Sequence, residues 1–165
     1  MINIKYLLFY SFMCVSLLSC AQSKHLIKNI YATYSVHLPG NVAVDRNGNS
    51  ISLTDTLSII YIETASEKIH WFHAWKGAKD YSIITTLITE LPFNAGTNKM
   101  TNEKIILRST KGNKLWKLQL VPGEKFFMAP LKILQGEIIL QGIYHGKKIT
   151  QKIFKQIELV SIPSV

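Results

Sequence analysis

The chain has 165 residues, which is enough for one domain with a real hydrophobic core. Its 19 Lys and Arg residues outnumber its 10 Asp and Glu residues, and the formal charge is +9. Such an excess indicates a solvated basic face or an anionic partner. Arg46 and Arg108 are the only arginines, so the sequence lacks an Arg-rich cluster and we expect no nucleic-acid partner.

The chain begins with a short apolar leader. Lys5 precedes an uncharged run from Tyr6 to Leu18, which is shorter than the roughly 20 apolar residues that a membrane-spanning helix needs. Its length is typical of a signal peptide. The run ends in Leu17-Leu18-Ser19-Cys20, which resembles the lipobox of bacterial lipoproteins. The resemblance implies that residues 1–19 are a signal peptide. It also implies that Cys20 receives diacylglycerol on its sulfur and becomes the acylated N-terminus.

The resemblance also gives an expected location. Three acyl chains would anchor the protein durably to a membrane, whereas one chain binds only marginally. Ala21, rather than aspartate, follows the cysteine. In enteric-type lipoproteins this implies passage to the outer membrane of the cell envelope, on the periplasmic or the surface side. The anions there are lipopolysaccharide, acidic glycans and acidic proteins.

A second interpretation of the same residues is ordinary secretion. Ser19-Cys20-Ala21 satisfies the small-x-small rule, so cleavage after Ala21 would give a secreted or periplasmic protein that begins at Gln22. An uncleaved membrane anchor is the third option. In either cleaved form the domain itself has no thiol, because Cys14 and Cys20 are the only cysteines. Its stability must therefore come from burial, without a disulfide.

We expect residues 20–29 to form the lipidated N-terminus and a short tether, and residues 30–165 to form a single β domain. From Ile30 to Leu38, apolar and polar residues alternate with the period of a half-buried strand, and Pro39-Gly40 ends the run. The Asn-Gly pair within residues 45–49 then predicts a tight hairpin turn.

The remaining segments are rich in Ile, Thr and aromatic residues and separated by short polar turns. We predict three further hairpins, from residues 57–64 with 68–75, 104–109 with 115–121, and 137–144 with 148–160. Residues 81–88 form another strand, and residues 91–102 and 122–136 form loops. About nine strands without a helical period predict an all-β fold, an antiparallel β-sandwich, Ig-like or similar, or a barrel.

No stretch carries a recognisable catalytic, metal or cofactor motif. The sequence has no Gly-x-Ser-x-Gly and no His-Glu-x-x-His, and the segment from Gly142 to Lys148 is one residue too short between its glycines for a phosphate loop. His70 and His73 are three residues apart and should face opposite sides of a strand. We therefore expect no catalytic residue, no metal, no cofactor and no enzymatic activity.

Two segments are candidates for surface contacts. Trp71, His73 and Trp75 should share one face of a strand, and exposed indoles there would bind glycans. Burial of both tryptophans in the core is the interpretation we favour, because large aromatic side chains dominate protein interiors.

The second candidate combines apolar and basic residues. Phe126 and Phe127 lie in the loop of residues 122–136, Lys147 ends the last predicted turn, and Lys148 begins the last predicted strand. From these features we expect a non-enzymatic lipoprotein that docks an envelope protein at the membrane surface. A glycan-binding surface lipoprotein, a secreted periplasmic β protein, and an enzyme whose residues meet only in the fold are the alternatives.

Overall fold

The computed structural model describes residues 26–37, 43–44, 50–51, 55–77, 79–123 and 128–161. The predicted leader with Cys20, the turn at residues 45–49, and Phe126 and Phe127 lie outside these residues. The described strands are β1 (Ile27–His37), β2 (Ala43–Val44), β3 (Ser50–Ile51), β4 (Asp55–Thr64), β5 (Ile69–Lys76), β6 (Lys79–Ile88), β7 (Phe93–Thr97), β8 (Lys104–Leu107), β9 (Lys114–Pro122), β10 (Ile138–Tyr144), β11 (Lys147–Ile153) and β12 (Gln156–Glu158).

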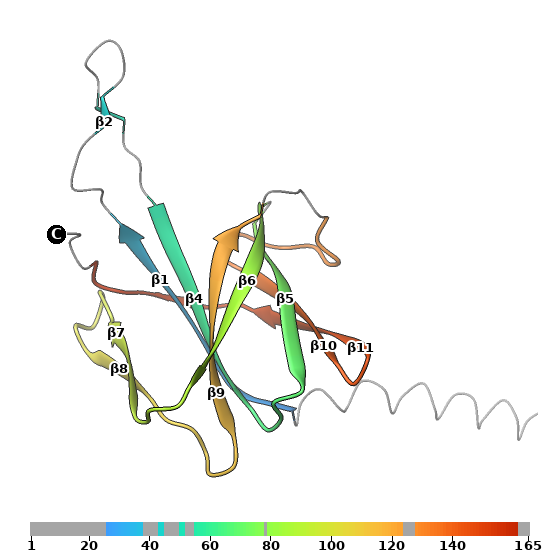
Figure 1. The fold of residues 1–165 in the computed structure, drawn as a ribbon. Helices are drawn as coiled ribbons and strands as arrows, with labels where there is room; N and C mark the ends of the chain where they lie inside the picture. Colours follow the sequence, from blue (N-terminus) through green and yellow to red (C-terminus); the bar gives the residue numbers. More distant parts are fainter. Residues whose placement is uncertain are drawn as a thin grey trace, which may run out of the picture.

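One large sheet dominates the fold (Figure 1). Its eight strands follow the order β11-β10-β5-β6-β9-β4-β1-β12, and β2–β3 and β7–β8 form two separate two-stranded sheets. Neighbouring strands of the large sheet are antiparallel except β1 and β12, which run parallel with Thr33 opposite Ile157. The all-β prediction is confirmed. The predicted purely antiparallel pairing is wrong at β12, and eight of the described strands form one mixed, curled sheet in place of two stacked ones.

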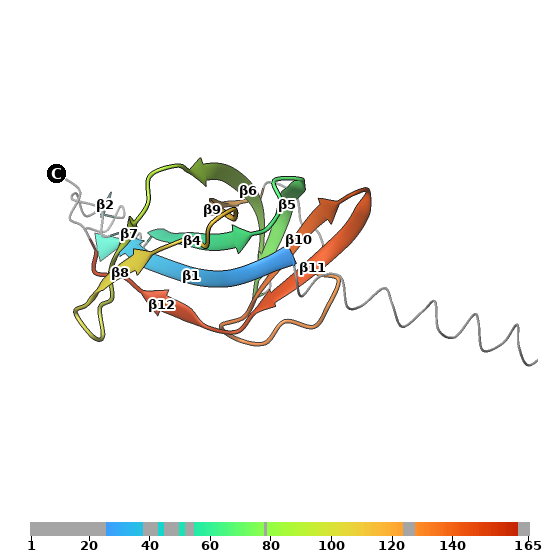
Figure 2. The ribbon, with the colours of Figure 1, turned by 90° about the horizontal axis from the view of Figure 1, so that it is seen from below.

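The sheet curls into a half-barrel, so that β10 and β11 are steeply inclined to β1 and β4 (Figure 2). Its two edge strands are consecutive in sequence, since β11 ends at Ile153 and β12 begins at Gln156. Consecutive Cα atoms are about 3.8 Å apart, so these two residues lie within about 11 Å of one another. The short link through Phe154 and Lys155 therefore requires the edges of the sheet to approach each other.

Three chain reversals join strands that pair with one another. His145 and Gly146 both have positive φ, 49° and 74°, and join β10 to β11 as a two-residue turn, the arrangement that matches strand twist. Lys76 pairs with Lys79 across the turn between β5 and β6. Ala43 pairs with Ile51, which confirms the first predicted hairpin.

Two predicted hairpins are wrong. β4 does not pair with β5 but lies between β1 and β9, whereas β5 lies between β10 and β6. β8 does not pair with β9 but with β7, a strand inside the predicted loop of residues 91–102. A turn signal shows where the chain reverses, but it does not show which distant strand supplies the hydrogen-bonding partner.

The main hydrophobic core lies inside the curl. Its buried members alternate along the strands of the large sheet, and Trp71 is the largest of them. They are Leu26, Ala32, Ile60, Ile62, Ile69, Trp71, Ala74, Leu118, Leu120, Ile138, Leu140 and Ile153. A smaller cluster of Tyr61, Ala95, Leu107 and Leu115 joins the β7–β8 hairpin to the outer face of β4 and β9. We call the face opposite the main core the outer face.

Candidate functional site

Both candidate tryptophans of β5 are buried, Trp71 with 2% and Trp75 with 5% of its surface exposed. They nevertheless face opposite sides of the sheet. The register between β5 and β10 passes from His73 opposite Gln141 to Trp71 opposite Gly142, so Phe72 is an extra, unpaired residue of a β-bulge. Trp71 therefore belongs to the main core, while Trp75 lies with His73 on the outer face.

Because of this bulge, the prediction that Trp71 and Trp75 share one face of the strand is wrong. The prediction that both tryptophans are buried is confirmed. A sugar ring stacks on an exposed indole face, and neither side chain offers one. Gly142 explains how Trp71 fits, because a Cβ on Gly142 would lie 2.8 Å from Cε3 of the indole. The absence of a side chain at position 142 lets the ring lie directly against the backbone of β10.

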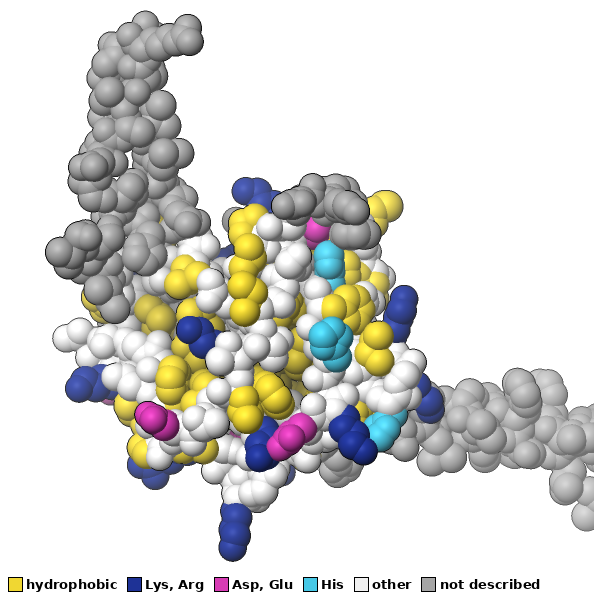
Figure 3. Space-filling model, in the orientation of Figure 1, with side chains coloured by type: hydrophobic (Ala, Val, Ile, Leu, Met, Phe, Trp, Pro, Cys, Tyr) yellow, Lys and Arg dark blue, Asp and Glu magenta, His cyan; other side chains and the backbone are white. Residues whose placement is uncertain are grey.

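The same bulge places both histidines of β5 on the outer face, so the prediction that they face opposite ways is wrong. His70 lies between the core residues Ile69 and Trp71, and the ring of His73 is 4.5 Å from that of Trp75. Histidine side chains lie near β5 on the face shown in Figure 3. Among the described residues no group of three potential metal ligands is found.

His73 lies close to the carboxylate of Asp80, a contact that the sequence pattern does not predict. Its Nε2 atom lies 3.5 Å from Oδ2 of Asp80 on β6, and both side chains are largely buried. An imidazole with a carboxylate is also part of many catalytic sites. Here Gly123 lies directly against the carboxylate, because a Cβ at position 123 would be 2.5 Å from Oδ2 of Asp80. The Gly123 N–H also donates to the main-chain carbonyl oxygen of Asp80 at 3.1 Å. The buried pair is thus suited to fixing β5 against β6 rather than to reaching a substrate.

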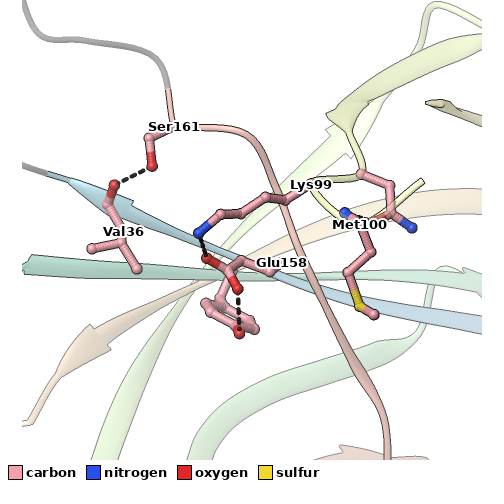
Figure 4. Close-up of polar contacts among 7 residues, drawn as sticks. Val36, Lys99, Met100, Glu158 and Ser161 are labelled. Carbon is pink, nitrogen blue, oxygen red and sulfur yellow. Dashed lines mark hydrogen bonds and ion pairs between the residues drawn. The ribbon is translucent and has the colours of Figure 1, made fainter. Parts of the chain in front are cut away.

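A cluster of polar residues ties β12 to the rest of the domain (Figure 4). The Glu158 carboxylate accepts hydrogen bonds from Lys99 Nζ at 2.5 Å and from the Tyr34 hydroxyl at 3.1 Å. The hydrogen bond from Lys99 holds the pKa of Glu158 below its ordinary value. Burial and the Glu158 carboxylate raise the pKa of Tyr34. Ser161 adds a hydroxyl bond to the Val36 carbonyl oxygen at 2.6 Å.

Glu63 is the most deeply buried acid in the described part of the chain, with 1% of its surface exposed. It accepts hydrogen bonds from Asn113 Nδ2, the Thr110 N–H and Asn29 Nδ2. Burial by itself would raise the pKa of Glu63, but these hydrogen bonds outweigh it and hold the pKa below its ordinary value. All three hydrogen-bond donors belong to this domain. Glu63 on β4 therefore has a structural role, because it connects β4 to β1 and to the segment between β8 and β9.

Lys76, at the end of β5, places a half-buried cation on the inner side of the curl. Its neighbours Ala74 on β5 and Ile138 on β10 belong to the main core, so its side chain points inward. Nζ donates to Ser58 Oγ on β4 at 3.0 Å and lies 5.2 Å from the centroid of the Tyr34 ring. Burial lowers the pKa of Lys76.

Exposed apolar side chains gather near the β11–β12 link. Phe154 in the link is 71% exposed, and Lys152 Nζ lies 5.4 Å from its ring centroid. The same Nζ is 2.7 Å from Glu137, whose carboxylate accepts the Leu134 N–H at 2.7 Å. Leu134 is itself exposed. We call Leu134, Phe154, Lys152 and Lys155 the Phe154 surface.

The loop before β10 extends this surface. Met128 and Leu131 are exposed on that loop, and Gln156 Nε2 donates to the Gly136 carbonyl oxygen at 2.7 Å. Figure 2 shows the loop on the same side as the β11–β12 link. The predicted lysines Lys147 and Lys148 are exposed at the far end of β11, about 20 Å from Phe154 for a strand of this length. The structure thus does not bring them together with Phe154.

No family model, curated protein or solved structure matches this chain. The part of the chain that the structure describes contains no helix long and apolar enough to cross a membrane.

Two of these features are not predictable from the sequence pattern alone. The pattern predicts a turn around Lys76, and only the curl of the sheet places its side chain inside. The pattern also predicts a continuous strand over residues 148–160, which in fact breaks at Phe154 between β11 and β12. One feature of the sequence could have indicated that Phe154 is exposed: it lies between two lysines, in Lys152-Ile153-Phe154-Lys155.

Proposed function

We propose that the chain is a non-enzymatic cell-envelope lipoprotein whose β domain docks a partner protein at the membrane surface. The Phe154 surface carries the proposal. Scattered exposed apolar residues are normal, but apolar side chains close together and flanked by charge are typical of contact sites. The lipobox-like leader supports the location, and the β domain without a thiol supports a binding role that needs no redox chemistry.

The composition of the surface indicates the chemistry of the partner. A large aromatic side chain such as Phe154 can fill an apolar pocket and act as the anchor of an interface. Lys152, Lys155 and the exposed Lys132 of the neighbouring loop favour acidic residues around that pocket. Lys147 and Lys148 add positive charge along the same hairpin and would attract an acidic partner from a distance. We therefore propose an envelope protein with an apolar pocket and an acidic rim.

The architecture that presents this surface is part of the proposal. The two edge strands of the large sheet, β11 and β12, are connected by only two residues. Such a sheet resembles an incomplete barrel more than a sandwich of two sheets. We therefore favour the barrel-like form of the predicted fold. In this form the Phe154 link is the seam where the sheet nearly closes.

Site-specific photocrosslinking in cells tests the docking. Leu134 on the Phe154 surface and Ile84 on β6 are both 55% exposed, so a crosslinking residue at either position is equally accessible. We expect one adduct from position 134 that is absent from position 84. A Phe154→Ser substitution should abolish the adduct, and charge reversal at the exposed Lys147, Lys148 and Lys155 should reduce it.

A reciprocal crosslink from the identified partner then verifies the pair. Circular dichroism of each variant controls for folding, because a substitution at a largely exposed residue should leave the spectrum unchanged. Equal adducts from positions 134 and 84, or an adduct indifferent to Phe154→Ser, would contradict docking at this surface.

A further inference from the structure

The side chain of Lys76 extends into the interior of the curled sheet and reaches a strand that is not its neighbour. β5, which carries Lys76, and β4, which carries Ser58, are separated in the sheet by β6 and β9. The 3.0 Å hydrogen bond between Lys76 Nζ and Ser58 Oγ is therefore a contact through the interior, not along the sheet. Tyr34 is directly opposite Ser58 on β1 and completes the surroundings of the ammonium group.

The positive charge of Lys76 has no acidic counterpart among the described residues. None of the ion pairs in this part of the chain involves Lys76. Tyr34 links Lys76 to Glu158, but the Glu158 carboxylate is already bound to Lys99 and to the Tyr34 hydroxyl. Burying a charge without a partner costs free energy, and burial lowers the pKa of Lys76 accordingly.

Within the described part of the chain, the hydrogen-bonding capacity of Lys76 and Ser58 is also incompletely used. An ammonium group has three donors, and Ser58 accepts one of them. The Ser58 hydroxyl accepts this bond and keeps its own proton to donate. These two groups can therefore donate to the two oxygen atoms of one bound anion, with the Tyr34 ring at its side.

We propose that Lys76, Ser58 and Tyr34 form a binding site for a carboxylate at this end of the half-barrel. One ammonium group matches a single negative charge, whereas a phosphate dianion would leave charge unmatched in a partly apolar interior. Leu120 beside Ser58 and Ile138 beside Lys76 provide the apolar surroundings. Ser58 is only 2% exposed, whereas Lys76 is half-buried, so the carboxylate would approach from the side of Lys76 and Ser58 would add one hydrogen bond.

The carboxylate can come from a fatty acid or from the C-terminus of a peptide. Both present the same head group to Lys76, and they differ in the chain attached to that group. The purified full-length chain is titrated separately with octanoate, with a tripeptide that has a free carboxyl end, and with inorganic phosphate. The side-chain ¹⁵Nζ resonance of Lys76 is followed by NMR, with the exposed Lys104 of the separate β7–β8 hairpin as the internal control.

We expect a saturable shift at Lys76 with octanoate or the tripeptide, no matching shift at Lys104, and a rise in the pKa of Lys76 when the anion is bound. The ligand that saturates at lower concentration identifies the source. Lys76→Met should abolish binding, Lys104→Met should leave it unchanged, and Ser58→Ala should weaken it about tenfold, the loss of one hydrogen bond to a charged group.

Three results would overturn the site. They are a shift at Lys76 that is not saturable, unchanged binding by Lys76→Met, and binding of phosphate that is tighter than binding of either carboxylate. Lys76→Arg separates loss of the charge from loss of the fold, because it keeps the cation and should retain measurable binding. None of these outcomes depends on docking at the Phe154 surface.

Discussion

Lys76 Nζ donates to Ser58 Oγ at 3.0 Å although their strands are not neighbours in the sheet. This one bond connects two distant parts of the curl across its inside. It also places a cation where the surrounding residues are mainly apolar. The bond therefore contributes to the closure of the half-barrel while the charge of Lys76 opposes it.

The first prediction concerns the pH dependence of stability at Lys76. Burial lowers the pKa of Lys76 from its ordinary value of 10.5, so the folded protein binds fewer protons than the unfolded chain between the lowered pKa and 10.5. The free energy of unfolding should therefore rise with pH across this window. Lys76→Met should lack the rise. Urea unfolding at several pH values between about 7 and 9.5 measures it, with the exposed Lys79→Met as control.

Keeping the measurement below about pH 10 is important, because burial raises the pKa of Tyr34, Tyr61 and Tyr81. A tyrosine whose folded pKa is raised loses stability as pH rises beyond its unfolded pKa, which opposes the lysine effect. Parallel stability curves for the wild type and Lys76→Met would show that Lys76 is not desolvated.

The second prediction concerns Glu63. Its hydrogen bonds hold the pKa of the folded carboxyl below 4.5, so its contribution is complete above the unfolded pKa and is lost as pH falls through the folded pKa. We expect Glu63→Gln to lower the free energy of unfolding at pH 7 by about 1–3 kcal/mol, the range for charged hydrogen bonds. The difference from the wild type should shrink under acidic conditions.

Glu67→Gln is the matched control for this prediction. Glu67 is exposed and paired with Lys114 at 2.9 Å, an arrangement that contributes about 0–1 kcal/mol. Denaturant titrations of both variants at pH 7 and pH 4 provide the comparison. If Glu63→Gln cost no more than Glu67→Gln at pH 7, the three hydrogen bonds would not stabilise the fold as inferred.

The third prediction concerns the contact between Gly142 and Trp71. A Cβ at position 142 would lie 2.8 Å from the indole and 3.0 Å from the His70 carbonyl oxygen. Gly142→Ala should therefore destabilise the protein by about 1–3 kcal/mol, as overpacked cores do. Part of this loss should disappear in a background of Trp71→Leu. A double-mutant cycle by chemical denaturation measures the coupling, and a value near zero would mean that the indole does not lie against Gly142.

The fourth prediction concerns anchoring. Cys20→Ala should release the protein from the membrane fraction or leave it unprocessed, because no other residue at that position can form the thioether. Cys14→Ala, within the predicted leader, should remain lipidated and membrane-bound. Fractionation and intact-mass spectrometry distinguish the forms. A Cys20→Ala protein that remained membrane-bound at the mature mass would exclude lipidation as the anchor.

The bulge at Phe72 shows why the candidate site could be predicted only in part. Alternation along residues 68–75 predicts a strand, and the strand is there. It also predicts one face for Trp71 and Trp75, and a single inserted residue reverses that result. A period-two pattern specifies faces only while the register is unbroken, and the bulge is set by the pairing with β10, which lies far along the chain.

By itself the sequence determined the β character of the domain, the tight turn at His145-Gly146, the absence of any disulfide within the domain, and a leader that resembles a lipidation signal. These properties depend on residues next to one another, whose backbone preferences and side-chain chemistry act locally. Only the tertiary structure decided that β4 and β5 lie apart, that His73 meets Asp80, and that Lys76 lies inside the curl. Those relationships depend on which distant strands pair and on how far the sheet bends, and both are fixed by packing across the whole core.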